Sequence, residues 1–132
     1  MNYVAKWYDG ILNRSSLSLP QSVRVEGVRQ QHLGPRLEYA KVEVLVEPAV
    51  SFEVRFASDV LQIDANRIFL EAAVFGLLDI LLVSEAYPLR NVSVTVTRCD
   101  VDPVDSSEMA FRHAGRDAGR KVISALSARR VP

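Results

Sequence analysis

Several residue types are scarce in this sequence of 132 residues, and each shortage excludes a class of site. Cys99 is the only cysteine, so neither an internal disulfide nor a metal site built from several cysteines can form. The lack of disulfides fits a reducing, intracellular compartment. Only two histidines are present and neither is near Cys99 in the sequence, so no nucleophilic Cys–His pair is visible.

An excess of charge of either sign is also lacking, because 16 Lys and Arg residues balance 16 Asp and Glu residues. Any nucleic-acid surface must therefore be a local patch. The longest apolar stretch, residues 68–83, is interrupted by Glu71 and Asp79, which favours a buried helix over a membrane span. The first residues lack a basic segment followed by an apolar core, so we expect no signal peptide, no membrane contact and a cytoplasmic location.

What is present is the composition of one globular domain, with 48% hydrophobic and 24% charged residues. Residues 1–20 stand apart as an amphipathic segment and linker, and residues 21–132 form the domain. In the N-terminal segment the apolar residues fall on one side of a short helix: Val4, Trp7, Tyr8, Ile11 and Leu12. A helix this short is marginal alone, so we expect it to pack on its own domain or on a second copy.

The periodicity of the domain predicts strand, strand, strand, helix, strand, helix, which is an α+β arrangement. Alternation of apolar and polar residues predicts strands near residues 22–27, 39–46, 50–56 and 92–97. Gly27 indicates a bulge or the end of the first strand. The second and third strands, joined by a short turn, are predicted to form a hairpin. The first long helix is predicted from Asp64 to about Ser84.

The last helix has the best-defined start. Asp105 is predicted to cap it, and Glu108, three residues later, completes a capping box worth roughly 0.5–2 kcal/mol. The same carboxylates resemble a catalytic or metal cluster, but the capping box explains both of them. Small residues recur along one side of the helix, which implies a close approach to the sheet or to the other helix: Ala110, Ala114, Gly115, Ala118 and Gly119.

Four segments placed on these elements resemble domain IV of translation elongation factor G: residues 39–44, 52–54, 87–88 and 104–111. The resemblance covers roughly residues 22–128, and its last segment is highly specific. It implies a two-layer sandwich of the ribosomal protein domain 2-like fold, with about four strands, two long helices on one face and a left-handed β-α-β crossover. In that family the domain enters the decoding site of the small ribosomal subunit.

The sequence departs from the family at the positions that work on the ribosome. No Gly-rich loop ending in Lys-Ser or Lys-Thr is present, so we expect a free-standing relative without a GTP site. Asp102 stands where the family carries a histidine in a tip loop, and a carboxylate there would repel phosphate. The other tip loop, glycine- and arginine-rich in the family, includes His32 and Arg36 in this chain. Translocase activity is therefore not expected.

Two clusters of charged residues remain as candidate sites. The acidic loop with Asp100, Asp102 and Asp105 lacks the ligand spacing of an EF-hand, which favours a solvated loop over a metal site. The basic ridge has its arginines four residues apart on the last helix, with a lysine beside them: Arg112, Arg116, Arg120 and Lys121. Such a ridge is either a solvated face or an RNA contact. His113 and Asp117, one turn apart on the same helix, are predicted to pair.

The sequence thus predicts a non-catalytic, translation-related module without a cofactor. It would bind the ribosome, its RNA or a translation factor through the basic ridge and through the tip residues His32, Arg36 and Asp102. The alternative is a protein-interaction or self-assembling module that kept the fold and uses residues 1–14 to form a homo-oligomer. No arrangement of residues indicates an enzyme.

Overall fold

The computed structural model describes residues 3–6, 19, 21–57, 67–82 and 91–130, without the side chains of Leu33, Arg36 and residues 127–130. The elements of the domain are β1 (Val23–Leu33), β2 (Arg36–Pro48), β3 (Glu53–Phe56), α2 (Arg67–Leu81), β4 (Val92–Asp100) and α3 (Glu108–Arg130). A short helix is also present at residues 3–6. The rest of the predicted N-terminal helix, including Trp7, lies outside the described residues, as do both ends predicted for the first long helix.

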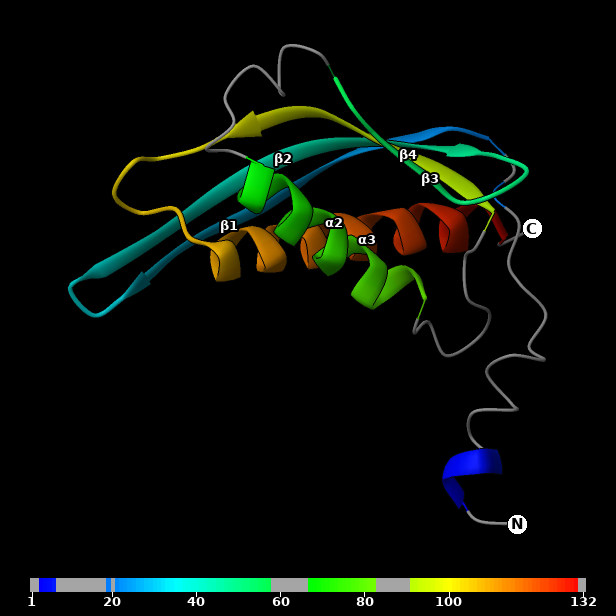
Figure 1. Cartoon of the computed structure of the whole chain (residues 1–132), viewed down its shortest axis with the longest axis horizontal. Coiled ribbons are helices and arrows are strands. Elements are labelled where there is room, and N and C mark those ends of the chain that lie inside the picture. The colour runs from blue at the N-terminus through cyan, green and yellow to red at the C-terminus, as the bar shows by residue number, and fades with distance from the viewer. Residues whose placement is uncertain (1–2, 7–18, 20, 58–66, 83–90, 131–132) are drawn as a thin grey trace.

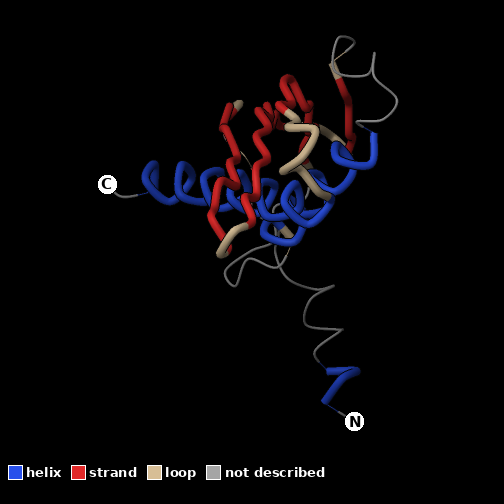
Figure 2. Tube along the Cα trace, turned by 90° about the vertical axis from the view of Figure 1, so that its left-hand side faces the viewer, coloured by secondary structure: helices blue, strands red, loops and turns tan. Residues whose placement is uncertain are grey.

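The strands form one mixed sheet in the order β1-β2-β4-β3. The pairs β1–β2 and β2–β4 are antiparallel, whereas β3–β4 is parallel. Figures 1 and 2 show both helices on one face of this sheet. The α+β class, the four strands and the helical layer on one face are thereby confirmed.

The predicted hairpin between the second and third strands is wrong. Both edges of β2 are occupied by β1 and β4, so β3 lies beyond β4 and pairs with it in parallel. The connection from β3 through α2 to β4 is therefore the β-α-β unit of the fold. Its left hand stays a prediction.

Strand β1 continues through Gly27, which pairs in register with Val42. The glycine marks neither a bulge nor an end; it lets α3 approach, because a Cβ at this position would overlap the carbonyl oxygen of Ala114. The predicted tip loop at residues 30–36 is mostly strand. The chain reverses at Gly34, whose φ of 64° suits glycine, and at Pro35.

The core lies between the sheet and the two helices. Alternate residues of the central strands point into it, among them Val42, Val44, Val46, Val94 and Val96. The helices contribute, among others, Leu70, Leu77, Phe111 and Val122. Leu19 is also buried in this core, so the packed unit includes a residue of the predicted linker. Of the helices in the described ranges, none combines the length and apolar character needed to cross a membrane.

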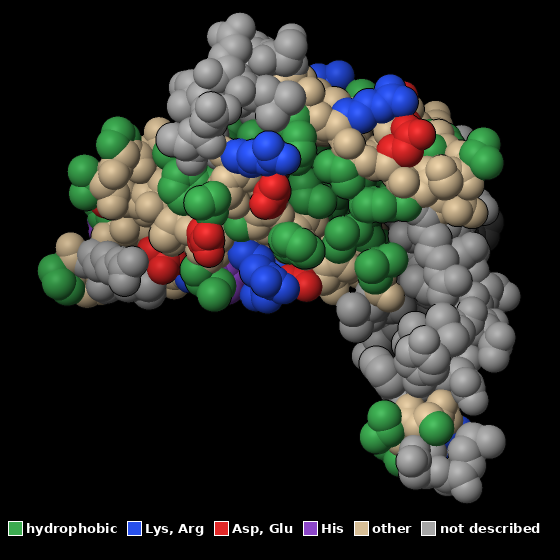
Figure 3. All heavy atoms as spheres, viewed as in Figure 1, with side chains coloured by type: hydrophobic (Ala, Val, Ile, Leu, Met, Phe, Trp, Pro, Cys, Tyr) green, Lys and Arg blue, Asp and Glu red, His purple; other side chains and the backbone are tan. Residues whose placement is uncertain are grey.

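Glycines bring the two helices into backbone contact, as the small residues predicted. A Cβ at Gly115 would overlap the carbonyl oxygen of Ala73, and a Cβ at Gly76 would overlap that of Arg112. The outer side of the helical layer carries exposed hydrophobic side chains. Figure 3 shows hydrophobic side chains gathered over α2 and towards β3 on the surface of the molecule.

Candidate functional site

Helix α3 begins at Glu108 and is capped by Ser107. The Ser107 hydroxyl accepts a hydrogen bond from the backbone N–H of Ala110 at 3.1 Å. The predicted cap at Asp105, and with it the capping box that includes Glu108, is therefore wrong. Asp105 cannot serve as the cap because it lies in the preceding turn, where its carbonyl accepts the N–H of Tyr39 at 3.1 Å.

Asp102 organises the loop before α3. Its carboxylate accepts the backbone N–H groups of Val104 and Asp105 at 2.8 and 2.9 Å, and these bonds lower the pKa of Asp102. The Ser106 hydroxyl accepts the N–H of Asp102 at 2.8 Å and donates to the carbonyl of Tyr39 at 2.7 Å. Asp102 thus has a structural role, and the loop is fastened to β2.

This fastening brings the two predicted tip segments together. A pocket of about 330 Å³ between them is lined by Pro35, Leu37, Val104 and Asp105. His32 is exposed on β1 just before the turn, and Arg36 opens β2. Three of the four residues that line the pocket are apolar, and one of them, Val104, is 87% exposed.

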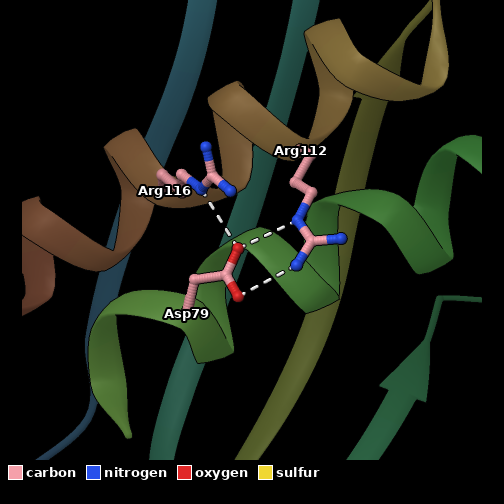
Figure 4. A network of polar contacts seen from close by, with 3 residues as sticks. All are labelled: Asp79, Arg112 and Arg116. Carbon is pink, nitrogen blue, oxygen red and sulfur yellow. Dashed lines mark hydrogen bonds and ion pairs between the residues drawn. The ribbon is translucent and has the colours of Figure 1, made fainter. Parts of the chain in front are cut away.

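Two arginines of the basic ridge are joined to α2 through Asp79 (Figure 4). Arg112 donates to both carboxylate oxygens of Asp79, from Nε at 2.9 Å and from Nη2 at 3.1 Å. Arg116 donates from Nε at 3.0 Å. The hydrogen bond from Arg112 is the main cause that lowers the pKa of Asp79, and Arg116 adds to it.

The lysine of the ridge covers the free edge of the sheet. Lys121 Nζ donates to the carbonyl of Glu26 at 2.6 Å, and Asp117 accepts the N–H of Val28 at 3.0 Å. Lys121 and Asp117 also form an ion pair at 3.1 Å. These contacts block the β1 edge from pairing with another strand. The predicted pair of His113 with Asp117 is wrong within the described structure, because Asp117 bonds to β1 and to Lys121 instead.

A cationic cluster surrounds His113 on the outer side of α3, and we define it as Arg29, His113, Arg116 and Arg120. Burial lowers the pKa of His113, and the three arginines lower it further, against an opposing effect of Glu38. Arg29 donates from Nε to Glu38 at 2.9 Å. Arg120 is exposed and forms no hydrogen bond or ion pair with a described residue.

Sequence reasoning missed Arg29 and Asp79. Asp79 carried a usable signal, since a carboxylate inside an apolar helix needs a cationic partner. Arg29 carried none, because its place beside His113 depends on the register of β1 against α3.

Cys99 and the acidic loop are the remaining candidates from the sequence. Burial, with a contribution from Asp100, raises the pKa of the Cys99 thiol to about 11, which keeps it protonated. In the described ranges no three His, Cys, Asp or Glu side chains gather as metal ligands would.

Comparison with known proteins identifies the family of the chain. The family described as "Elongation factor G, domain IV" matches residues 16–125. The chain belongs to this family. A crystal structure of a protein from Thermus thermophilus is similar in fold, with a TM-score of 0.67 and 23% identity over 80% of this chain. The match spans only 16% of that protein. The domain IV resemblance is confirmed, and the chain is a module of translation-factor type.

Proposed function

We propose that this domain IV module binds ribosomal RNA through the cationic cluster and is not itself an enzyme. The observation that carries the proposal is that Arg29, Arg116 and Arg120 all act on the charge of His113, with Arg120 exposed and the other three residues partly exposed. A translation-factor module in the cytoplasm meets ribosomal RNA as its most abundant polyanion. Because the whole chain has zero net charge, such binding requires a local cluster of this kind.

The arginines of the cluster keep donors available for phosphate. Arg29 and Arg116 each use Nε for a carboxylate, and no bond to a described residue occupies their terminal nitrogens. Arg120 keeps all of its donors. A guanidinium presents five N–H groups in a fork that matches phosphate oxygens, so two partly engaged arginines and one unengaged arginine suffice for several contacts.

Several other cations of the described surface are paired with carboxylates. On the opposite face of the sheet, Arg24 pairs with Glu43 at 3.0 Å and Lys41 pairs with Glu26 at 3.4 Å. Within the ridge, Arg112 and Lys121 serve structural contacts. The cationic cluster is therefore the better candidate for a polyanion.

The tip has a secondary role in this proposal. His32 and Arg36 lie at the end of the hairpin, where they add a weaker contact, and the Asp102 carboxylate stays turned to its own loop. We propose no catalysis and no GTP hydrolysis by this chain. The protonated Cys99 thiol supports that view, since a thiolate is the reactive form.

Co-sedimentation with small ribosomal subunits across a salt series tests the proposal. Arg120→Glu should weaken binding and lower the slope of log affinity against log salt by about 1, since one phosphate contact is lost. The matched control is Arg98→Glu, which makes the same charge change at an exposed site on β4 that lies opposite Glu43. An equal effect of both substitutions, or no binding at low salt, would contradict the proposal.

A further inference from the structure

The outer side of α2 carries a row of exposed apolar side chains. Ile68, Phe75 and Leu82 are spaced seven residues apart and are 55%, 58% and 43% exposed. At 1.5 Å per residue the row extends over roughly 21 Å. Met109 of α3, 56% exposed, lies beside it. Figure 3 shows this apolar surface facing the viewer.

The row contributes to two hollows along α2, which we together call the α2 groove. The first has a volume of about 460 Å³ and lies between α2 and the start of α3. Its apolar lining consists of Ile68, Ala72, Phe75 and Met109, and its polar lining, which we call the rim, includes Glu71, Glu108 and Arg112. The second, of about 300 Å³, is lined by Phe52, Leu78, Leu82 and Asn91. An exposed apolar groove with a polar rim is typical of a site for an amphipathic helix.

The chain itself contains a helix that fits. The helix at residues 3–6 exposes Tyr3 and Val4 by 82% and 69%, and the apolar pattern continues in the sequence with Trp7, Tyr8, Ile11 and Leu12. A short helix gains stability only by packing. Figures 1 and 2 both show it apart from the helical layer of its own domain. Its apolar side is therefore available to another molecule.

The charges of the N-terminal helix and of the α2 groove are also complementary. The exposed Lys6 follows the apolar residues of the helix, and carboxylates occupy the rim of the groove. Glu108 forms no ion pair with a described residue, while Glu71 pairs only with its helical neighbour Arg67 at 3.2 Å. A lysine arriving with an apolar helix would meet these carboxylates.

We propose that the N-terminal helix of one copy binds in the α2 groove of a second copy, and that the exchange is reciprocal. Reciprocal contacts produce a closed, two-fold symmetric dimer. Aromatic side chains bury about 150–250 Å² each, so Tyr3, Trp7 and Tyr8, used in both directions, supply the area of a stable interface. No lining residue of the groove belongs to the cationic cluster, so the dimer leaves that cluster open.

The mass of the full chain in solution, measured by light scattering across a concentration series, tests the proposal. The wild type should have twice the 14.7 kDa of one chain. Phe75→Ser should yield the single-chain mass with unchanged circular dichroism, because Phe75 is exposed and outside the core. The control is Leu37→Ser, which removes a 39% exposed apolar side chain in the separate pocket at the tip of the β1–β2 hairpin and should keep the dimer. A monomeric wild type, or a dimer that survives Phe75→Ser, would overturn the proposal.

Mixing two full-length variants tests directly whether the N-terminal helix of one copy binds the groove of another copy. A chain with Val4→Asp and Trp7→Asp lacks a competent helix, and Phe75→Ser lacks a competent groove. Each should be monomeric alone. Their equimolar mixture keeps one intact helix–groove pair and should form a heterodimer that dissociates at a higher concentration than the wild type. Absence of a heterodimer, as expected if each helix binds its own domain, would refute the exchange.

Discussion

The outer sides of the two helices differ in chemistry, although their inner sides are built alike. Inside the layer, α2 and α3 meet through Gly76 and Gly115, and each glycine lies against a carbonyl of the opposite helix. Outside, α3 carries Arg116 and Arg120 of the cationic cluster, whereas α2 carries the exposed apolar row. The inner contacts hold the two helices together on one face of the sheet. The different outer surfaces leave this module with one surface suited to a polyanion and another suited to an apolar partner.

The largest effect is expected where the inner sides meet. Gly115→Ala should destabilise the domain by about 3 kcal/mol, because the added methyl group overlaps the carbonyl oxygen of Ala73. Helix propensity alone would predict the opposite sign, a gain of about 1 kcal/mol. Urea unfolding followed by circular dichroism measures the difference.

Gly119→Ala is the matched control for that substitution. Its Cβ would meet the Cβ of Ile80 at 2.8 Å, which is a milder overlap than the one with the carbonyl oxygen of Ala73 and needs a smaller shift of the helices. We expect a clearly smaller loss. A stabilised Gly115→Ala protein would show that the helices do not approach as described.

An intermediate effect is expected at the link between the two helices. Asp79→Ala leaves Arg112 and Arg116 as adjacent cations without their carboxylate, at a cost of about 1–2 kcal/mol because the group is partly exposed. The folded pKa of Asp79 lies below 3.8, so its contribution is full above that pH and is lost as pH falls through the folded pKa. The free energy of unfolding of the wild type and of Asp79→Ala, measured between pH 7 and pH 2, should therefore differ at pH 7 and become equal at low pH.

Asp79→Ala should also change binding to the ribosome. Removing the carboxylate frees donors of two arginines, so Asp79→Ala should bind ribosomal subunits more tightly at low salt while being less stable. Weaker binding by a folded Asp79→Ala protein would show that the link itself shapes the RNA surface.

The smallest effect is expected at His113. Because burial and its three neighbouring arginines lower the folded pKa below 6.5, the unfolded chain binds the proton first as pH falls. Stability should therefore decline as pH falls below about 6.5, until the folded pKa is passed. His113→Gln should remove this part of the pH dependence, as measured by thermal unfolding.

Much of the fold could be predicted, because alternation and small-residue spacing act locally. The strands with Val44 and Val94 and the close approach at Gly115 follow from such patterns. The partners of the strands do not, because alternation shows which face is buried and not which strand lies alongside. For that reason the short turn after β2 predicts a hairpin with β3, although β3 pairs with β4.

The candidate site could be predicted only in part for a related reason. The spacing of Arg116 and Arg120 places them on one side of a helix, but their partners come from other elements. Asp79 engages Arg116 from α2, and Arg29 joins the cluster from β1. The exposed apolar row of α2 is hidden in the sequence because that helix is apolar on nearly all sides, which leaves no periodic signal for the side that faces solvent.

Co-sedimentation of Arg120→Glu and Phe75→Ser with small ribosomal subunits, side by side at low salt, tests the division between the two outer surfaces most directly. Both substitutions change exposed side chains, one on α3 and the other on α2. The account predicts that less Arg120→Glu than wild type pellets with the subunits, while Phe75→Ser pellets as the wild type does. Loss of binding by both proteins, or by Phe75→Ser alone, would contradict it.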